Sequence, residues 1–295
     1  MLNRWGSNPL ESSNLSLSAI YQDRCKRGGS SASFMATPKR LNFEIFLVSF
    51  VILFLEIVLI RWISTEVRIF AYLNNLVLLA CFLGIGLGCY WSSKPPKMLG
   101  SIGALALLIA MIQLPFRVQF QGQDIHLFRD IPLLLSTFTD SVIWYESAKA
   151  ADWINILVGI IATLVIFMTT LCVFVPLGQR LGSCLDQHPH PIAAYSVNIV
   201  ASLLGIWVFC AISFKYAPPA IWFAIPLACM GVMILTDVRA RVIGLLGLIL
   251  CAGLVTLTMV GAPKTSAQDK TVWSPYQRLD LTPMTQPTDA FDPMY

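Results

Sequence analysis

Long apolar runs alternate with short polar segments along most of the chain, and this pattern predicts membrane-spanning helices. A helix needs about 20 mainly apolar residues to cross a bilayer, and its backbone groups must be paired within the chain. The runs are continuously apolar, which excludes the alternating strands of a closed barrel. Seven runs reach or approach the required length: residues 42–63, 69–92, 98–115, 152–176, 192–214, 218–236 and 242–261. The predicted fold is an all-α integral membrane protein, a bundle of about seven transmembrane helices.

The long connector between the third and fourth runs leaves the number of spans at seven or eight. Its central piece, IPLLLSTFTDSVIWY (residues 131–145), is short for a span and contains an acidic residue. We expect an interfacial or re-entrant helix there. An eighth span at this piece would reverse the side of the membrane for everything that follows it.

Polar composition separates two flanking segments from the bundle. Residues 1–40 are rich in Ser, Arg and Lys and lack the apolar core and cleavage site of a secretory signal. We expect this segment to be disordered, with either Met1 or Met35 as the start of the chain. The transmembrane bundle is predicted over residues 41–262, and residues 263–295 form a C-terminal tail.

Composition supports a membrane protein and argues against nucleic-acid binding. Hydrophobic residues make up 56% of the chain and charged residues only 12%, whereas soluble domains carry roughly 25% charged residues. The net charge of +4 is spread over short polar segments, so the expected partner is the lipid bilayer and no nucleic acid is expected.

Neither the cysteines nor the histidines predict a metal site or a cofactor. No C-x-x-C motif occurs, and the sequence HPHP at 188–191 is typical of a turn between helices. The cysteines within apolar runs are interpreted as small core-filling residues. They are Cys81, Cys89, Cys172, Cys210, Cys229 and Cys251.

The distribution of Lys and Arg predicts the orientation. With seven spans, the basic residues of three polar segments fall on one side, which the positive-inside rule assigns to the cytoplasm. The protein is then expected in the inner (plasma) membrane with its N-terminus in the cytoplasm. Its C-terminal tail is on the opposite face. Eight spans would return the tail to the cytoplasm and export two of the arginines, and the charges leave this choice open. These basic residues are Arg4, Arg24, Lys26, Arg27, Lys39, Arg40, Lys94, Lys97, Arg239 and Arg241.

Glu56 and Arg61 are ionisable residues within the first apolar run. Each costs about 2.5–3.5 kcal/mol at the centre of a span on insertion scales. Five positions correspond to about 140° around a regular helix, so the two side chains do not share a face. Either the helix has a π-type bulge, or each finds a partner on another helix.

The candidate partners are Asn74, Asn75 and Asn198, which also lie in apolar runs. Three interpretations of these polar residues are open. The first is hydrogen bonding between helices, the second is a substrate or proton site in the bundle, and the third is an Arg61 that only extends to the interface. On the first two interpretations, we expect Glu56 to be buried and hydrogen-bonded to another span.

Gly84, Gly86 and Gly88 recur at every second position of the second apolar run. A phosphate-binding glycine loop needs a preceding strand and a helix N-terminus, which the middle of a span does not provide. The glycines therefore predict close packing against another helix. Gly205 predicts the same for the fifth run.

Four motifs occur in a characteristic order: EIVLIRWIS (residues 56–64), CFLGIGLGCYWSSKP (81–95), LGQRLGSCLDQHPHPIAAYSVNIVASLLGIW (177–207) and SPYQRLDL (274–281). The first resembles the E-V-x-x-x-R-L-L-S element of the membrane-embedded spermidine synthase family, the polyamine aminopropyltransferases. The second and third are similar to its glycine-rich second helix and to its basic loop with the following Tyr-x-x-Asn/Asp helix. The last resembles the S-x-Y-Q-x-I-x-V strand that opens its catalytic domain.

The resemblance implies a membrane domain followed by a domain of methyltransferase fold. It implies that Gln277, with Tyr276 beside it, lies near the sulfur-nucleoside donor. The family also needs a glycine-rich turn and acidic residues for the ribose and the diamine, and residues 282–295 contain no such turn. We therefore expect the membrane half alone, with the first strand of a catalytic domain attached, no catalytic residue and no cofactor. Truncation, a split gene and a separate membrane subunit remain alternatives.

Three functions follow as hypotheses. The first is an integral membrane subunit or anchor that is not catalytic alone, with a separate methyltransferase-fold chain or another membrane subunit as its partner. The second is a membrane carrier of a small polar molecule, with Glu56, Arg61 and Asn198 near its site. The third is an aminopropyltransferase completed by a separate methyltransferase-fold chain.

Overall fold

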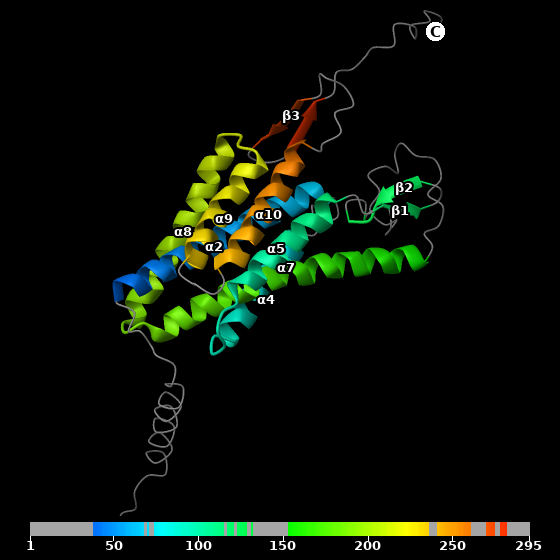
Figure 1. The fold of residues 1–295 in the computed structure, drawn as a ribbon. Helices are drawn as coiled ribbons and strands as arrows, with labels where there is room; N and C mark the ends of the chain where they lie inside the picture. Colours follow the sequence, from blue (N-terminus) through cyan, green and yellow to red (C-terminus); the bar gives the residue numbers. More distant parts are fainter. Residues whose placement is uncertain are drawn as a thin grey trace, which may run out of the picture. The chain divides into compact units, whose positions relative to one another are not determined.

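The computed structural model describes residues 38–67, 70, 74–114, 117–120, 123–128, 131, 153–235, 241–260, 270–274 and 278–281. Within these ranges the chain forms seven α-helices and two short β-hairpins (Figure 1). By its contacts the chain divides into Met1–Leu41 and Asn42–Tyr295. The second unit contains every described element except the first turn of the first helix.

The helix positions agree with the seven predicted runs. The fourth helix continues past Pro176, where its predicted span ended, because a missing N–H is tolerated in membrane helices when neighbouring groups compensate for it. The helices are α2 (Pro38–Glu66), α4 (Asn74–Tyr90), α5 (Met98–Gln113), α7 (Trp153–Gln187), α8 (Pro191–Phe214), α9 (Pro219–Leu235) and α10 (Arg241–Val260). The predicted turn at the HPHP sequence is confirmed, since residues 188–190 link α7 to α8.

Three helices of the described part are long and apolar enough to cross a membrane: Lys39–Glu66, Ile156–Gln187 and Pro191–Phe214. They indicate a membrane protein. The other apolar helices are shorter: Asn75–Tyr90, Met98–Gln113, Pro219–Leu235 and Val242–Thr256. At 1.5 Å per residue, a helix of this kind extends roughly 25 Å, slightly less than a hydrocarbon core of about 30 Å.

Contacts between side chains give the relative directions of the helices. Ser101 of α5 donates a hydrogen bond to the carbonyl oxygen of Val173 in α7 (2.7 Å), and Thr169 of α7 contacts the sulfur of Met111 in α5. Since positions rise in α5 as they fall in α7, these two helices are antiparallel. By the same reasoning α2 and α8 are parallel, because Ser49 bonds to Asn198 and Arg61 bonds farther along α8.

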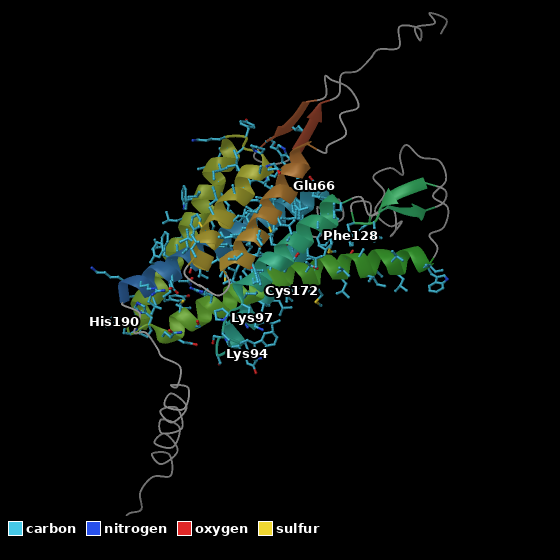
Figure 2. The ribbon with its side chains drawn as sticks, in the orientation of Figure 1. Glu66, Lys94, Lys97, Phe128, Cys172 and His190 are labelled. Carbon is cyan, nitrogen blue, oxygen red and sulfur yellow. The ribbon has the colours of Figure 1, made fainter. Side chains whose placement is uncertain are left out.

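These directions define two ends of the bundle. We call the end that holds Glu44, Lys94 and Arg180 the basic end, and the end that holds Ser213 and Trp222 the hairpin end. Figure 2 shows Lys94, Lys97 and His190 toward one end of the helices and Glu66 toward the other.

The predicted close packing of glycines is confirmed at two of the three positions in α4. A Cβ atom at Gly84 would lie 2.6 Å from the carbonyl oxygen of Leu171, and one at Gly88 would collide with α7 in the same way. A Cβ at Gly86 would meet nothing within 4 Å. Gly205 of α8 also packs closely, since a Cβ there would lie 3.0 Å from the carbonyl oxygen of Phe50.

The interpretation of the cysteines needs a correction. Cys81 and Cys251 are buried, as core-filling residues should be, but Cys172 and Cys210 are exposed on the surfaces of α7 and α8. These two thiols lie on helix faces that no described helix covers. Figure 2 labels Cys172 on α7.

The C-terminal hairpin differs from the predicted single strand. Strand β4 comprises only Arg278–Leu281 and pairs antiparallel with β3 (Lys270–Trp273). The strand attached after the bundle is therefore paired within its own chain, because the preceding residues supply a partner strand. A second hairpin joins β1 (Arg117–Phe120) to β2 (Gln123–His126). The helix expected over residues 131–145 lies outside the described residues except for Ile131.

Candidate functional site

Arg61 lies near the end of α2 and reaches two distant parts of the chain. Its Nη1 group donates a hydrogen bond to the hydroxyl oxygen of Ser213, near the end of α8. Its Nη2 group donates to the carbonyl oxygen of Ser274, which directly follows β3. One guanidinium group therefore joins α2, α8 and the C-terminal hairpin.

Aromatic rings surround this guanidinium group. Its Cζ atom lies 4.3 Å from the ring centroid of Trp222 in α9 and 5.9 Å from that of Phe209 in α8. The ring of Trp273, the last residue of β3, packs edge-on against Trp222 with 5.4 Å between centroids. We call Arg61, Phe209, Ser213, Trp222, Trp273 and Ser274 the arginine cluster.

The arginine cluster stabilises a cation without a carboxylate partner among the described residues. Cation–π contacts contribute about 0.5–1 kcal/mol at exposed sites and about 2 kcal/mol or more when desolvated. Hydrogen bonds that involve a charged group contribute about 1.5–3 kcal/mol. Two donors, Nε of Arg61 and Nε1 of Trp222, are buried without a hydrogen-bond partner in this part of the chain. The cluster therefore combines strong contacts with unused donors.

Glu56 is buried in the core of the bundle, as predicted, with 3% of its surface exposed. Its Oε2 atom has no hydrogen-bond partner within the described residues, so the predicted bond to another span is not found at that oxygen. Glu56 interacts electrostatically with Cys81 of α4, whereas Arg61 contacts α8 and α9. Glu56 and Arg61 thus have separate surroundings, which agrees with their spacing.

The asparagines that were candidate partners have other roles. Asn198 accepts a hydrogen bond from the hydroxyl group of Ser49, at 2.6 Å, and so links α8 to α2. Asn75 is exposed at the start of α4. The side chain of Asn74 lies outside the described residues, as do Tyr276 and Gln277.

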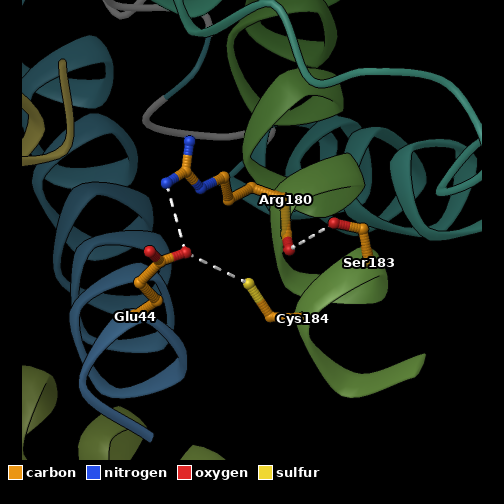
Figure 3. A network of polar contacts seen from close by, with 4 residues as sticks. All are labelled: Glu44, Arg180, Ser183 and Cys184. Carbon is orange, nitrogen blue, oxygen red and sulfur yellow. Dashed lines mark hydrogen bonds and ion pairs between the residues drawn. The ribbon is translucent and has the colours of Figure 1, made fainter. Parts of the chain in front are cut away.

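A second polar network lies at the basic end (Figure 3). Arg180 of α7 forms an ion pair with Glu44 of α2, with 3.2 Å between Nη2 and Oε2. The thiol of Cys184 donates to the same oxygen at 3.7 Å. Nearby, Nε2 of His188 lies 2.8 Å from Oδ1 of Asn42, which ties the turn before α8 to α2.

Sequence reasoning missed Ser213, Trp222 and Glu44. Ser213 is a hydroxyl within an apolar run, at the same end of its helix as Arg61, and this was a usable signal. Trp222 lies near a helix end, where the sequence does not distinguish a tryptophan at the membrane interface from one in the core. Glu44 lies within the first turn of the first run, and a charged residue at that position is typical of a helix end.

Comparisons with protein-family models, with curated proteins and with solved structures found no significant match. The resemblance to the membrane-embedded spermidine synthases therefore rests on the four sequence motifs alone.

Proposed function

We propose that this chain is an integral membrane anchor, a subunit whose helical bundle holds its C-terminal hairpin at one end. The observation that supports this most directly is the arginine cluster. Arg61 of α2 bonds to the chain at Ser274, and Trp222 of α9 packs against Trp273 of β3. The hairpin is thus attached by side chains from the bundle as well as by its covalent link to α10.

The proposal includes seven spans in the inner (plasma) membrane, with the N-terminus in the cytoplasm. The antiparallel arrangement of α5 and α7 supports seven rather than eight, because a single extra span between them would make them parallel. Lys94, Lys97 and Arg180 gather at the basic end, which the positive-inside rule assigns to the cytoplasm. The hairpin then faces the opposite side of the membrane.

Hydrogen–deuterium exchange of the full chain in lipid nanodiscs tests the attachment. In the Arg61→Ala variant we expect the amides of β3 and β4 to exchange about tenfold faster or more, because two hydrogen bonds and the ring contacts are lost. Arg180→Ala, which removes a cation at the basic end, is the matched control and should leave the hairpin unchanged. Equal hairpin exchange in the wild type and Arg61→Ala would contradict the anchor role of this cluster.

A second candidate is a membrane carrier of a small polar molecule, which the buried, unpartnered oxygen of Glu56 favours. Ionisable groups inside a bundle commonly mark transport pathways. Uptake of an amine into proteoliposomes that disappears in Glu56→Gln, with hairpin exchange unchanged, would favour the carrier.

The third candidate, an aminopropyltransferase completed by a separate methyltransferase-fold chain, is supported by the motifs. Gln277 alone offers one or two hydrogen bonds of about 1 kcal/mol each, against an association cost of at least about 4 kcal/mol. The isolated chain should therefore not bind decarboxylated S-adenosylmethionine. Micromolar binding of this nucleoside to the isolated chain in calorimetry would contradict the non-catalytic anchor and make Tyr276 and Gln277 the first residues to replace.

A further inference from the structure

Glu56 occupies a position where an ionised carboxylate has a high free energy. It lies ten positions before the end of α2, or about 15 Å along the helix axis, which is roughly the middle of a hydrocarbon core of about 30 Å. Its side chain is 3% exposed. Its Oε2 atom lacks a hydrogen-bond partner among the residues that the structure describes.

Among the described residues, the groups around Glu56 do not offset a negative charge. The titratable group that faces it there from another helix is the buried thiol of Cys81 in α4, which carries no positive charge. Arg61 shares the helix but points about 140° away, and its donors are directed to Ser213 and Ser274. Within the described ranges, no ion pair joins Glu56 to a cation.

We propose that Glu56 is a proton-binding site inside the bundle, and that the folded chain holds its side chain as an uncharged carboxylic acid. A buried, unpaired carboxylate is so costly that such a group neutralises instead. A proton is the ligand that fits, because it needs no extra volume in a packed core, unlike an amine or a metal ion. This inference does not depend on the anchor function.

The same helix provides a natural contrast. Glu44 lies three turns earlier in α2, at the basic end, where Arg180 pairs with it and the thiol of Cys184 donates to it. Those contacts give Glu44 a cationic partner, which Glu56 lacks among the described residues. Glu44 is therefore the matched comparison for the proposed acid at Glu56.

Labelling with the hydrophobic reagent dicyclohexylcarbodiimide tests the proposed protonation of Glu56. The reagent requires a protonated carboxyl: the acid oxygen bonds to the central carbon, the proton passes to a nitrogen, and an acyl shift gives a stable N-acylurea. In the full chain in nanodiscs, peptide mass spectrometry should find the adduct on Glu56 and at least tenfold less on Glu44. A water-soluble carbodiimide should instead label the exposed Asp186.

Infrared spectroscopy provides a second measurement that does not depend on access of the reagent. The wild type should show the carbonyl stretch of a protonated carboxyl in an apolar setting, and Glu56→Gln should lack it while keeping its helical amide band. Absence of this band in the wild type, or labelling of Glu44 as strong as that of Glu56, would overturn the proposal.

Discussion

Three charged side chains of α2 have different environments. Glu44 has a cationic partner, Arg61 has neutral acceptors and aromatic rings, and Glu56 has neither within the described residues. These differences follow from where each lies along and around one helix, since Arg180 lies at one end of the bundle and the acceptors on Ser213 and Ser274 lie at the other. The type of a residue alone therefore does not determine which partners a charged side chain has in this chain.

The ion pair between Glu44 and Arg180 should contribute only modestly to stability. The two side chains are 22% and 16% exposed, so water weakens their attraction. A double-mutant cycle with Glu44→Gln and Arg180→Gln should give a coupling of about 0.5–1 kcal/mol in detergent-based unfolding. The coupling should fall as salt is added, and a coupling that salt does not change would show that the contact is not mainly electrostatic.

At the scale of elements, α4 and α7 are held in close contact by glycine. Gly84 and Gly88 lie one turn apart on the face that meets α7, and Gly178 of α7 faces back toward α4 at the same level. Without side chains at these points the two backbones approach closely, which favours van der Waals contact where lipid provides no hydrophobic driving force.

Replacing Gly84 with Ala should destabilise the bundle, whereas Gly86→Ala should not. A methyl group at Gly84 would overlap backbone atoms of Leu171, and overpacking of this kind costs about 1–3 kcal/mol. The methyl group at Gly86 meets open space. Unfolding in mixed micelles, followed by tryptophan fluorescence, measures both variants. Equal stability of the two would mean that α4 and α7 can separate at little cost.

At the scale of the whole molecule, the two ends of the bundle have different chemistry. Basic side chains and an ion pair occupy one end, and an arginine among aromatic rings holds a hairpin at the other. If the helices cross the membrane as we propose, these ends face different compartments, and the hairpin lies away from the cytoplasm.

Cysteine labelling of intact cells tests this topology. In a background without native cysteines, a cysteine at Lys94 should resist a membrane-impermeant maleimide and one at Lys215 should react, since these exposed residues lie at opposite ends. Both should react after permeabilisation, which is the control. Rapid modification at position 94 in intact cells would overturn the assignment. Arg239, also predicted to face the cytoplasm, lies outside the described residues.

The sequence by itself determined where the helices lie, because an apolar run long enough to span a bilayer has few alternatives to a helix. It also predicted the close packing at Gly84, Gly88 and Gly205, since a small residue in a span has little other structural use. It placed Glu56 in the core, because an acid in an apolar run is costly in lipid.

Only the tertiary structure decided which helices meet and what each polar group contacts. Ser213 lies 152 positions from Arg61, and Ser274 lies 213 positions from it, and no local pattern encodes a contact over such distances. The hairpin was also missed, because four-residue strands carry too little periodicity to reveal their pairing. The apolar pattern fixes each helix separately, whereas their mutual rotation depends on how all the side chains pack together.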